Sequence, residues 1–175
     1  MRCMVFDIET VPDTALGEKV FGFEGLDDDD IAKAKVFHQT QKTGSDFLPL
    51  YQHRIVAISV AWRSHEGFKV WSLGEESSSE QELIQRFFDG IERYTPDLVS
   101  WNGSGFDLPV LHYRALAHGV TAPRYWENGD NDREFRFNNY QNRYHWRHID
   151  LMDVLAAFQS RARAPLDQIA TMLGF

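Results

Sequence analysis

Two carboxylates separated by one residue, Asp7 and Glu9, lie close to the start of the chain. Five of the first six residues are apolar or aromatic, which is typical of a buried strand. Residues i and i+2 of a strand point to the same face, so we expect Asp7 and Glu9 to converge. Carboxylates that close require a partner or raised pKa values, and their usual partner is a hard cation such as Mg²⁺ or Mn²⁺. The alternative is a strand end at which both groups reach water.

A third acidic residue, Asp107, follows a predicted strand-to-helix turn. Residues 97–101 form a short apolar run, residues 102–106 contain two glycines, and a predicted helix covers 108–118. Ligands gather at such junctions in open α/β sheets, and helix N-termini attract phosphate. Asp107 is therefore a candidate site residue, and its alternative role is an ordinary helix N-cap.

The order of predicted elements indicates a single α/β domain with a mixed sheet flanked by helices. Strands are expected at residues 2–7, 54–62, 68–73, 97–101 and 148–150, and helices at 79–94, 108–118, 151–160 and 166–173. Residues 13–53 are expected to form an irregular insertion, in which the acidic run 27–30 begins a short helix. Residues 120–147 form a long polar and aromatic excursion.

Composition limits the class of protein. The 175 residues are 43% apolar, enough for a sizeable core. The single cysteine, Cys3, excludes an intrachain disulfide and favours a reducing compartment. No signal segment or long apolar run is visible, so we expect a soluble, cytoplasmic protein without membrane contact. A net charge of −8 argues against a broad basic surface for duplex DNA.

Three stretches, Phe6–Asp13, Val99–Leu111 and His148–Asp153, together resemble the 3′–5′ exonucleases of the DEDD superfamily. Asp7-x-Glu9 resembles their first motif and Asn102-x-x-x-Phe106-Asp107 their second. The chain is most similar to small stand-alone proteins related to the proofreading exonuclease of B-family DNA polymerases, and the resemblance covers nearly the whole chain. It implies an RNase H-like fold with a mixed five-stranded sheet flanked by helices.

The resemblance implies a two-metal mechanism with two Mg²⁺ or Mn²⁺ ions. Asp7 would bridge both ions, Glu9 would hold one ion and orient the water, and Asp107 would hold the other ion directly or through water. The implied reaction is hydrolysis of single-stranded nucleic acid from its 3′ end, with DNA favoured over RNA.

Six residues are candidates for contact with nucleic acid. Three lie beside the two motifs, and three lie in segment 133–148, which has four arginines and five aromatic residues, a composition suited to single strands. They are Thr10, Asn102, Phe106, Arg143, Tyr144 and Trp146. The alternative for segment 133–148 is a hairpin whose rings pack on the sheet and whose arginines are solvated.

The superfamily uses a fourth acid, Asp, preceded by Tyr four residues earlier or by His five residues earlier. Two pairs have the second spacing, His145/Asp150 and His148/Asp153. Both are weak candidates, because segment 148–153 resembles the region before the family's third motif. We therefore expect residues 1–175 to form a single exonuclease-like domain that lacks its C-terminal helix and third motif. Such a chain would be inactive if the missing acid is essential.

Two other functions fit parts of the sequence. One is a catalytically silent nucleic-acid-binding or scaffold domain of the same fold. The other is a phosphatase of the haloacid dehalogenase type, because residues 7–11 approximate its D-x-D-x-T/V motif and 129–132 its later acidic motif. Glu9 stands where that class needs Asp, which disfavours it. An aspartyl-phosphate intermediate would distinguish this class from a nuclease, which forms none.

Overall fold

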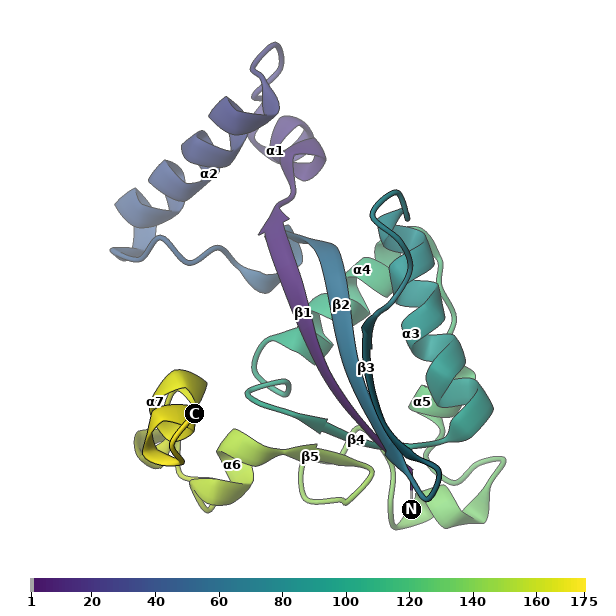
Figure 1. Cartoon of the computed structure of the whole chain (residues 1–175). Helices are drawn as coiled ribbons and strands as arrows, with labels where there is room; N and C mark the ends of the chain where they lie inside the picture. Colours follow the sequence, from purple (N-terminus) through teal and green to yellow (C-terminus); the bar gives the residue numbers. More distant parts are fainter. Residues whose placement is uncertain (1) are drawn as a thin grey trace.

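A computed structural model describes residues 2–175 and contains a mixed five-stranded sheet (Figure 1). The strands are β1 (Cys3–Pro12), β2 (His53–Ser64), β3 (Gly67–Ser72), β4 (Asp97–Ser100) and β5 (His148–Asp150). Their order across the sheet is β3-β2-β1-β4-β5. The first three strands pair antiparallel, whereas β4 and β5 run parallel to β1. The predicted mixed five-stranded sheet is confirmed.

Some of the helices pack on one face of this sheet. The α-helices are α1 (Thr14–Phe21), α2 (Asp28–Thr43), α3 (Glu80–Tyr94), α4 (Asp107–His118), α5 (Pro123–Trp126), α6 (Leu151–Leu155) and α7 (Leu166–Met172). Short 3-10 turns, η1 to η3, cover Leu50–Gln52, Arg133–Arg136 and Ser160–Ala162. Apolar side chains of α3, α4 and α5 form one core cluster with Met4, Phe6 and Ile8 of β1. Among residues 2–175, no helix is both long enough and apolar enough to cross a membrane.

The predicted start of α3 is confirmed. Ser79 precedes the helix, and its hydroxyl oxygen accepts a hydrogen bond from the Glu82 amide at 3.2 Å. The five buried residues of α3 recur at helical spacing and face the sheet: Leu83, Ile84, Phe87, Phe88 and Ile91.

Residues 13–53 are not irregular, as the sequence predicted, but form a helical hairpin of α1 and α2 that extends beyond the end of β1 (Figure 1). The acidic run does begin a helix, with Asp27 as its N-cap, but that helix has 16 residues. The hairpin is fixed by Lys35, which is 1% exposed. Its ammonium donates to the carbonyl oxygens of Asp13 and Gln52 at 2.7 and 3.2 Å. A buried lysine gives no apolar signal, which explains the wrong prediction.

Two element boundaries also differ from the prediction. β1 continues to Pro12 instead of ending at Asp7, so both carboxylates of the first motif lie within the strand. The helix predicted to run to Ser160 ends at Leu155, because Ala157 and Phe158 have φ values of 48° and 60° in the left-handed region.

A buried group of charges joins the end of β1 to helices α3 and α4. Arg114 of α4 forms ion pairs with Asp13 and with Glu80, each at 2.5 Å. His118 contacts Glu80 at 2.7 Å. Burial raises the pKa of Glu80, but hydrogen bonds from Arg114, His118 and the Ile55 amide outweigh it, so its pKa lies below the ordinary value.

We expect Arg114→Met to lower the free energy of unfolding by about 3–5 kcal/mol, because two buried carboxylates would lose their partner. Urea unfolding at neutral pH measures this change. A matched control is Arg86→Met, whose pair with Glu82 is half exposed and should cost less than about 1 kcal/mol. Equal costs for the two variants would contradict a buried, coupled cluster.

The lowered pKa of Glu80 predicts a pH-dependent contribution to stability. Ionised Glu80 stabilises the fold fully above its ordinary pKa of 4.5, and this contribution is lost as the pH falls through the lower pKa of the folded state. The difference in unfolding free energy between the wild type and Glu80→Gln should therefore shrink as the pH falls below 4.5. Urea titrations from pH 7 downward measure it, and a constant difference would refute the prediction.

Candidate active site

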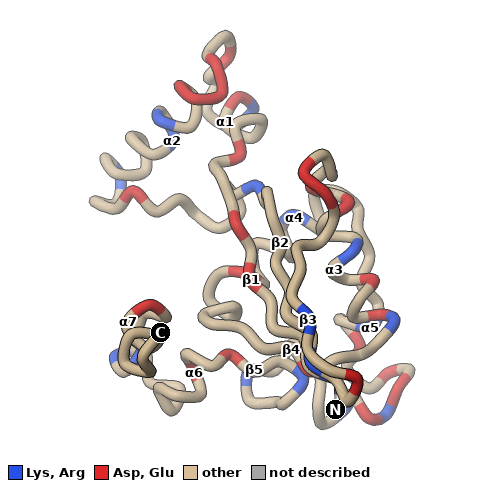
Figure 2. Tube along the Cα trace, viewed as in Figure 1, with Lys and Arg blue, Asp and Glu red and all other residues tan. Residues whose placement is uncertain are grey.

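The carboxylates of the first motif lie on the face of β1 that points away from α3 and α4. Met4, Phe6 and Ile8 are buried on the helix-covered face, whereas Asp7 and Glu9 alternate with them and are exposed. They are the two acidic residues of β1, and Figure 2 shows acidic positions along this strand. Their neighbours on β2, Ser59 and Ala57, are small. The predicted common face is confirmed, and it is open.

Asp107 is held directly against this strand. It is the first residue of α4 and is 3% exposed. Its Oδ1 accepts a hydrogen bond from the backbone amide of Ile8, the residue between Asp7 and Glu9, at 3.1 Å. The parallel pairing of β1 with β4 ends at Val5, so the Ile8 amide has passed the end of that ladder. The structure thus brings all three predicted carboxylates to one short stretch of β1.

This proximity has an electrostatic consequence. Burial, with the neighbouring charge of Asp7, raises the pKa of Asp107 to about 6. Burial and the charge of Glu9 also raise the pKa of Asp7. Negative charge is therefore unfavourable here without a compensating cation.

The loop between β4 and α4 leads to Asp107, and at two glycines its backbone lies close to a neighbouring side chain. A Cβ atom on Gly103 would lie 2.2 Å from the Ser100 hydroxyl oxygen, and one on Gly105 would lie 2.5 Å from the side-chain oxygen of Asn102. Asn102 itself has a φ of 61°. The loop therefore requires small residues at both glycines, which explains its composition.

Asp150 and Asp153, the two weak candidates for a fourth acid, have structural partners. The carboxylate of Asp150 accepts hydrogen bonds from the amides of Asn102 and Ser104, at 2.9 and 3.0 Å, and so supports the β4–α4 loop. Asp153 is 1% exposed and forms ion pairs with Arg143 and Arg163, each at 2.6 Å.

The histidines of the same two pairs are also engaged. His148 is buried and lies 2.8 Å from the Ser100 hydroxyl, and burial lowers its pKa to about 4. His145 Nδ1 accepts from the Asn139 amide at 3.0 Å. Neither pair presents a free imidazole and carboxylate.

An aromatic surface beside the carboxylates was found only in the structure. His53 lies between Phe106 and Phe47, with ring centroids 5.3 and 5.5 Å away, and Phe47 is 54% exposed. Thr10, next to Glu9, has its hydroxyl 2.9 Å from His53 Nδ1. Phe47 and His53 carry no motif and lie far from Phe106 in sequence, so only the path of the 13–53 insertion brings them together.

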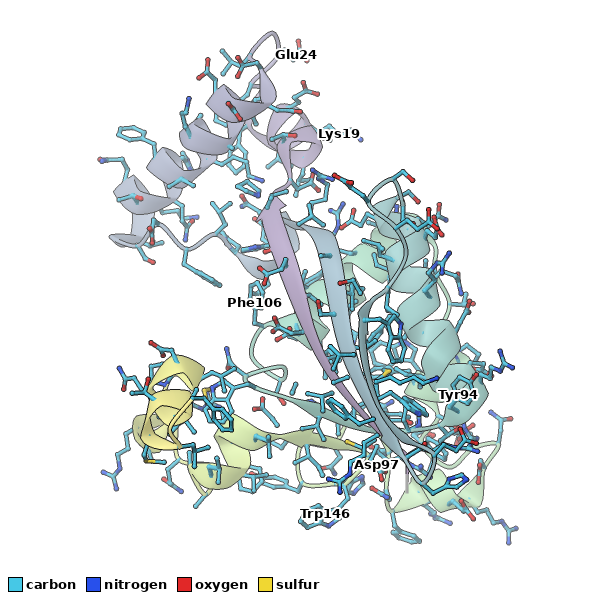
Figure 3. All side chains as sticks on the ribbon, in the orientation of Figure 1. Lys19, Glu24, Tyr94, Asp97, Phe106 and Trp146 are labelled. Carbon is cyan, nitrogen blue, oxygen red and sulfur yellow. The ribbon has the colours of Figure 1, made fainter. Side chains whose placement is uncertain are left out.

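The six predicted nucleic-acid contacts do not form one surface. Thr10, Asn102 and Phe106 lie near the carboxylates, whereas Figure 3 shows Trp146 at the far end of the sheet, near Asp97. Residues 133–147 contain no strand, so the hairpin considered as the alternative for segment 133–148 does not form.

Several rings and guanidinium groups of this segment pack against each other. Phe135 is buried between the guanidinium groups of Arg124 and Arg147, at 4.2 and 4.3 Å. Arg143 pairs with Asp153, while Tyr144 and Trp146 remain exposed. Part of the arginine and aromatic content is therefore structural, whereas Phe137 is exposed like Tyr144 and Trp146.

The acidic segment 129–132, considered above as a phosphatase motif, lies in a region of local hydrogen bonds and one ion pair. The Glu127 carboxylate accepts hydrogen bonds from the amides of Gly129 and Asn131, at 2.7 and 3.1 Å. Asp132 forms an ion pair with Arg124 at 2.8 Å. These contacts engage Glu127 and Asp132, whereas Asp130 is exposed.

The donor chemistry of Asp7, Glu9 and Asp107 fits a hard divalent cation, because all three are carboxylates and Asp107 is buried beside a like charge. As the side chains stand, no group of three His, Cys, Asp or Glu residues within 2–175 is arranged to hold a metal ion. The three residues therefore provide carboxylate ligands of the type that such a cation prefers. The position of one of them, Asp107, is fixed by its hydrogen bond from the Ile8 amide.

Comparison with known proteins identifies one family. The model for "predicted 3′–5′ exonuclease related to the exonuclease domain of PolB" matches residues 45–175, a range that includes Asp107 but neither Asp7 nor Glu9. The DNA polymerase of Pyrococcus glycovorans is 38% identical over 74 residues, which cover 38% of this chain and 10% of the polymerase. DNA polymerase 1 of Sulfurisphaera ohwakuensis is 49% identical over 47 residues, covering 27% of this chain and 5% of the polymerase.

A solved structure shares the fold. The family B DNA polymerase of the hyperthermophilic archaeon Pyrobaculum calidifontis aligns with a TM-score of 0.50 and 18% identity, covering 99% of this chain and 18% of the polymerase. The chain thus spans a small part of each polymerase, and its fold is RNase H-like.

The repulsion at Asp107 predicts how one substitution affects stability. In the presence of a chelator, we expect Asp107→Asn to unfold with a free energy about 1–3 kcal/mol higher than the wild type, because the amide keeps the acceptor for Ile8 and removes a buried charge. Mn²⁺ should raise the melting temperature of the wild type and of the exposed control Asp28→Asn, but much less that of Asp107→Asn. Equal Mn²⁺ stabilisation of all three proteins would show that Asp107 holds no ion.

Proposed function

Because the chain belongs to the family of 3′–5′ exonucleases related to the exonuclease domain of PolB, we propose that it is a metal-dependent nuclease that shortens single-stranded DNA from the 3′ end. The observation that carries the proposal is the hydrogen bond between Asp107 and the Ile8 amide, which joins the two acidic motifs. It supports a shared site for residues that are about a hundred positions apart in sequence.

The proposed cofactors are two Mg²⁺ or Mn²⁺ ions, which when bound activate a water and stabilise the leaving 3′-oxygen. Asp7 would contact both ions, Glu9 one of them and Asp107 the other. Asp7 and Glu9 lie on the open face of β1, where a phosphodiester can reach them. Asp107 is fixed by its backbone contact, so it would hold its ion without losing side-chain freedom on binding.

The aromatic surface of Phe47, His53 and Phe106 suits the bases of a single strand. Every base has a flat face that stacks on aromatic rings without regard to sequence. Phe106 directly precedes Asp107, so a base on this surface would lie near the carboxylates. Tyr144 and Trp146 are exposed and are proposed as a separate contact along the strand. Arg143, which pairs with Asp153, lies beside Tyr144, with its guanidinium 5.7 Å from the ring.

A catalytically silent nucleic-acid-binding domain is the second candidate. It is favoured by the engagement of Asp150 and Asp153 in structural contacts, which leaves no free fourth carboxylate on β5 or α6. Such a domain would bind single strands and leave them intact. The two candidates thus share a ligand and differ in hydrolysis.

We expect the protein to shorten a 5′-labelled single-stranded oligonucleotide stepwise from its 3′ end with Mn²⁺. Asp7→Asn should lower the rate roughly 100-fold or more, because it removes a contact to both ions. The exposed control Asp130→Asn should cleave at the wild-type rate. Cleavage that survives a chelator, or that is equal in Asp7→Asn, would contradict the two-metal proposal, and binding without cleavage would favour the silent domain.

A further inference from the structure

A hollow lies on the helix-covered face of the sheet, opposite to the face that carries Asp7 and Glu9. It is a cavity of about 700 Å³ between the β2–β3 hairpin and α3. Small-molecule sites usually have roughly 300–1,000 Å³. The cavity exists because β3 is the edge strand and all six of its residues are exposed, so α3 covers the sheet only as far as β2.

The register of the hairpin turns aromatic rings into this cavity. Trp71 pairs with the buried Val60, so it points to the helix-covered face, and Trp62 pairs with Met4 on the same face. Trp62 and Tyr94 meet edge to face with ring centroids 5.4 Å apart. Figure 3 places Tyr94 on the α3 side of the sheet and Phe106 on the other side of β1. Trp71 is 43% exposed and presents a free ring to the opening.

Cationic side chains exceed acidic ones around the cavity. Its lining includes four cations, Arg2, Lys69, Arg86 and Arg93, and two carboxylates, Glu66 and Asp89. This excess is unusual in a chain with a net charge of −8. Within residues 2–175, Lys69 and Arg93 have no carboxylate at ion-pairing distance, and Arg93 lies 5.1 Å from the Tyr94 ring. An anion can therefore bind here without displacing an existing ion pair of these two residues.

A glycine within α3 keeps the wall of the cavity open. Gly90 lies in the interior of a 15-residue helix, where glycine costs stability relative to alanine. A Cβ atom at this position would have no heavy atom within 4 Å, so packing does not require glycine. A side chain at position 90 would instead occupy the space that a ligand could use.

We propose that this cavity binds a mononucleotide, with the base stacked on Trp71 and the phosphate held by Lys69 and Arg93. The flat base of a nucleotide can stack on the aromatic rings of the cavity, and its dianionic phosphate can pair with cations that have no carboxylate partner. The site lies on the opposite face of the sheet from the carboxylates and does not depend on them or on nuclease activity. If the protein is an exonuclease, nucleoside monophosphates are also its products.

Isothermal titration calorimetry with dAMP, in a buffer with a chelator, tests the proposal separately from any nuclease activity. Wild-type protein should bind dAMP roughly tenfold or more tightly than adenosine or ribose 5-phosphate, since each lacks one of the two recognised parts. Gly90→Phe should weaken dAMP binding at least tenfold by filling the cavity, and Trp71→Ala should weaken it roughly tenfold. Gly90→Ala is the matched control, because it adds one carbon, favours the helix and should bind nearly as the wild type does.

Circular dichroism and melting curves verify that each variant is folded. Asp7→Asn tests whether dAMP binds instead at the face of the sheet that carries the carboxylates. The proposal is overturned if dAMP does not bind, if Gly90→Phe binds it as tightly as Gly90→Ala, or if Asp7→Asn weakens it as much as Gly90→Phe does. A parallel titration with single-stranded oligo-dA separates two sources of the same chemistry. If the oligonucleotide binds, dAMP does not, and Gly90→Phe abolishes oligonucleotide binding, the ligand of the cavity is a nucleic-acid strand and the mononucleotide proposal is overturned.

Discussion

The hydrogen bond from the Ile8 amide to the Asp107 carboxylate is the contact on which the candidate site depends. It forms because β1 is longer than β4, so that the Ile8 amide extends past the last paired residue and meets the start of α4. The same contact buries a negative charge beside Asp7. The contact that orders the Asp107 side chain therefore also creates repulsion between Asp107 and Asp7. A cation bound between the two carboxylates is the simplest group that would relieve this repulsion.

The rest of the fold maintains this arrangement from both sides. Asp150 holds the β4–α4 loop through two backbone amides, which fixes the position from which α4 begins. At the other end of β1, Arg114 and Lys35 tie Asp13 to the helices and to the 13–53 insertion. That insertion in turn delivers Phe47 to the side of Phe106. Residues without chemistry of their own thus determine where the acidic and aromatic groups meet.

The sequence predicted the parts of this structure that have local signals. Alternation along β1 placed Asp7 and Glu9 on one face, and the Ser79 cap with its apolar stripe predicted α3. Three features were not predicted, because they depend on contacts between residues that are distant in sequence. The first is the α1–α2 hairpin, which is fixed by the buried Lys35. The second is the early end of the helix after β5, where the Phe158 ring packs on Tyr144 with ring centroids 4.9 Å apart.

The third feature, the aromatic surface beside the carboxylates, joins residues from two separate segments of the chain. Composition also did not show which arginines and rings of segment 133–148 have structural partners. Phe135, Arg124 and Arg147 satisfy one another there, which no pattern of residue types reveals.

The central claim is that Asp7 and Asp107 together form a divalent-cation site, and crystallography with Mn²⁺ tests it most directly. An anomalous difference map from crystals soaked in Mn²⁺ should show a peak in contact with carboxylate oxygens of both residues, at about 2.0–2.3 Å, the range of hard-cation bonds to oxygen. The Asp107 contact to Ile8 should persist in the same crystal. A map with well-ordered carboxylates and no peak between them, from crystals soaked at a high Mn²⁺ concentration, would contradict a shared cation site.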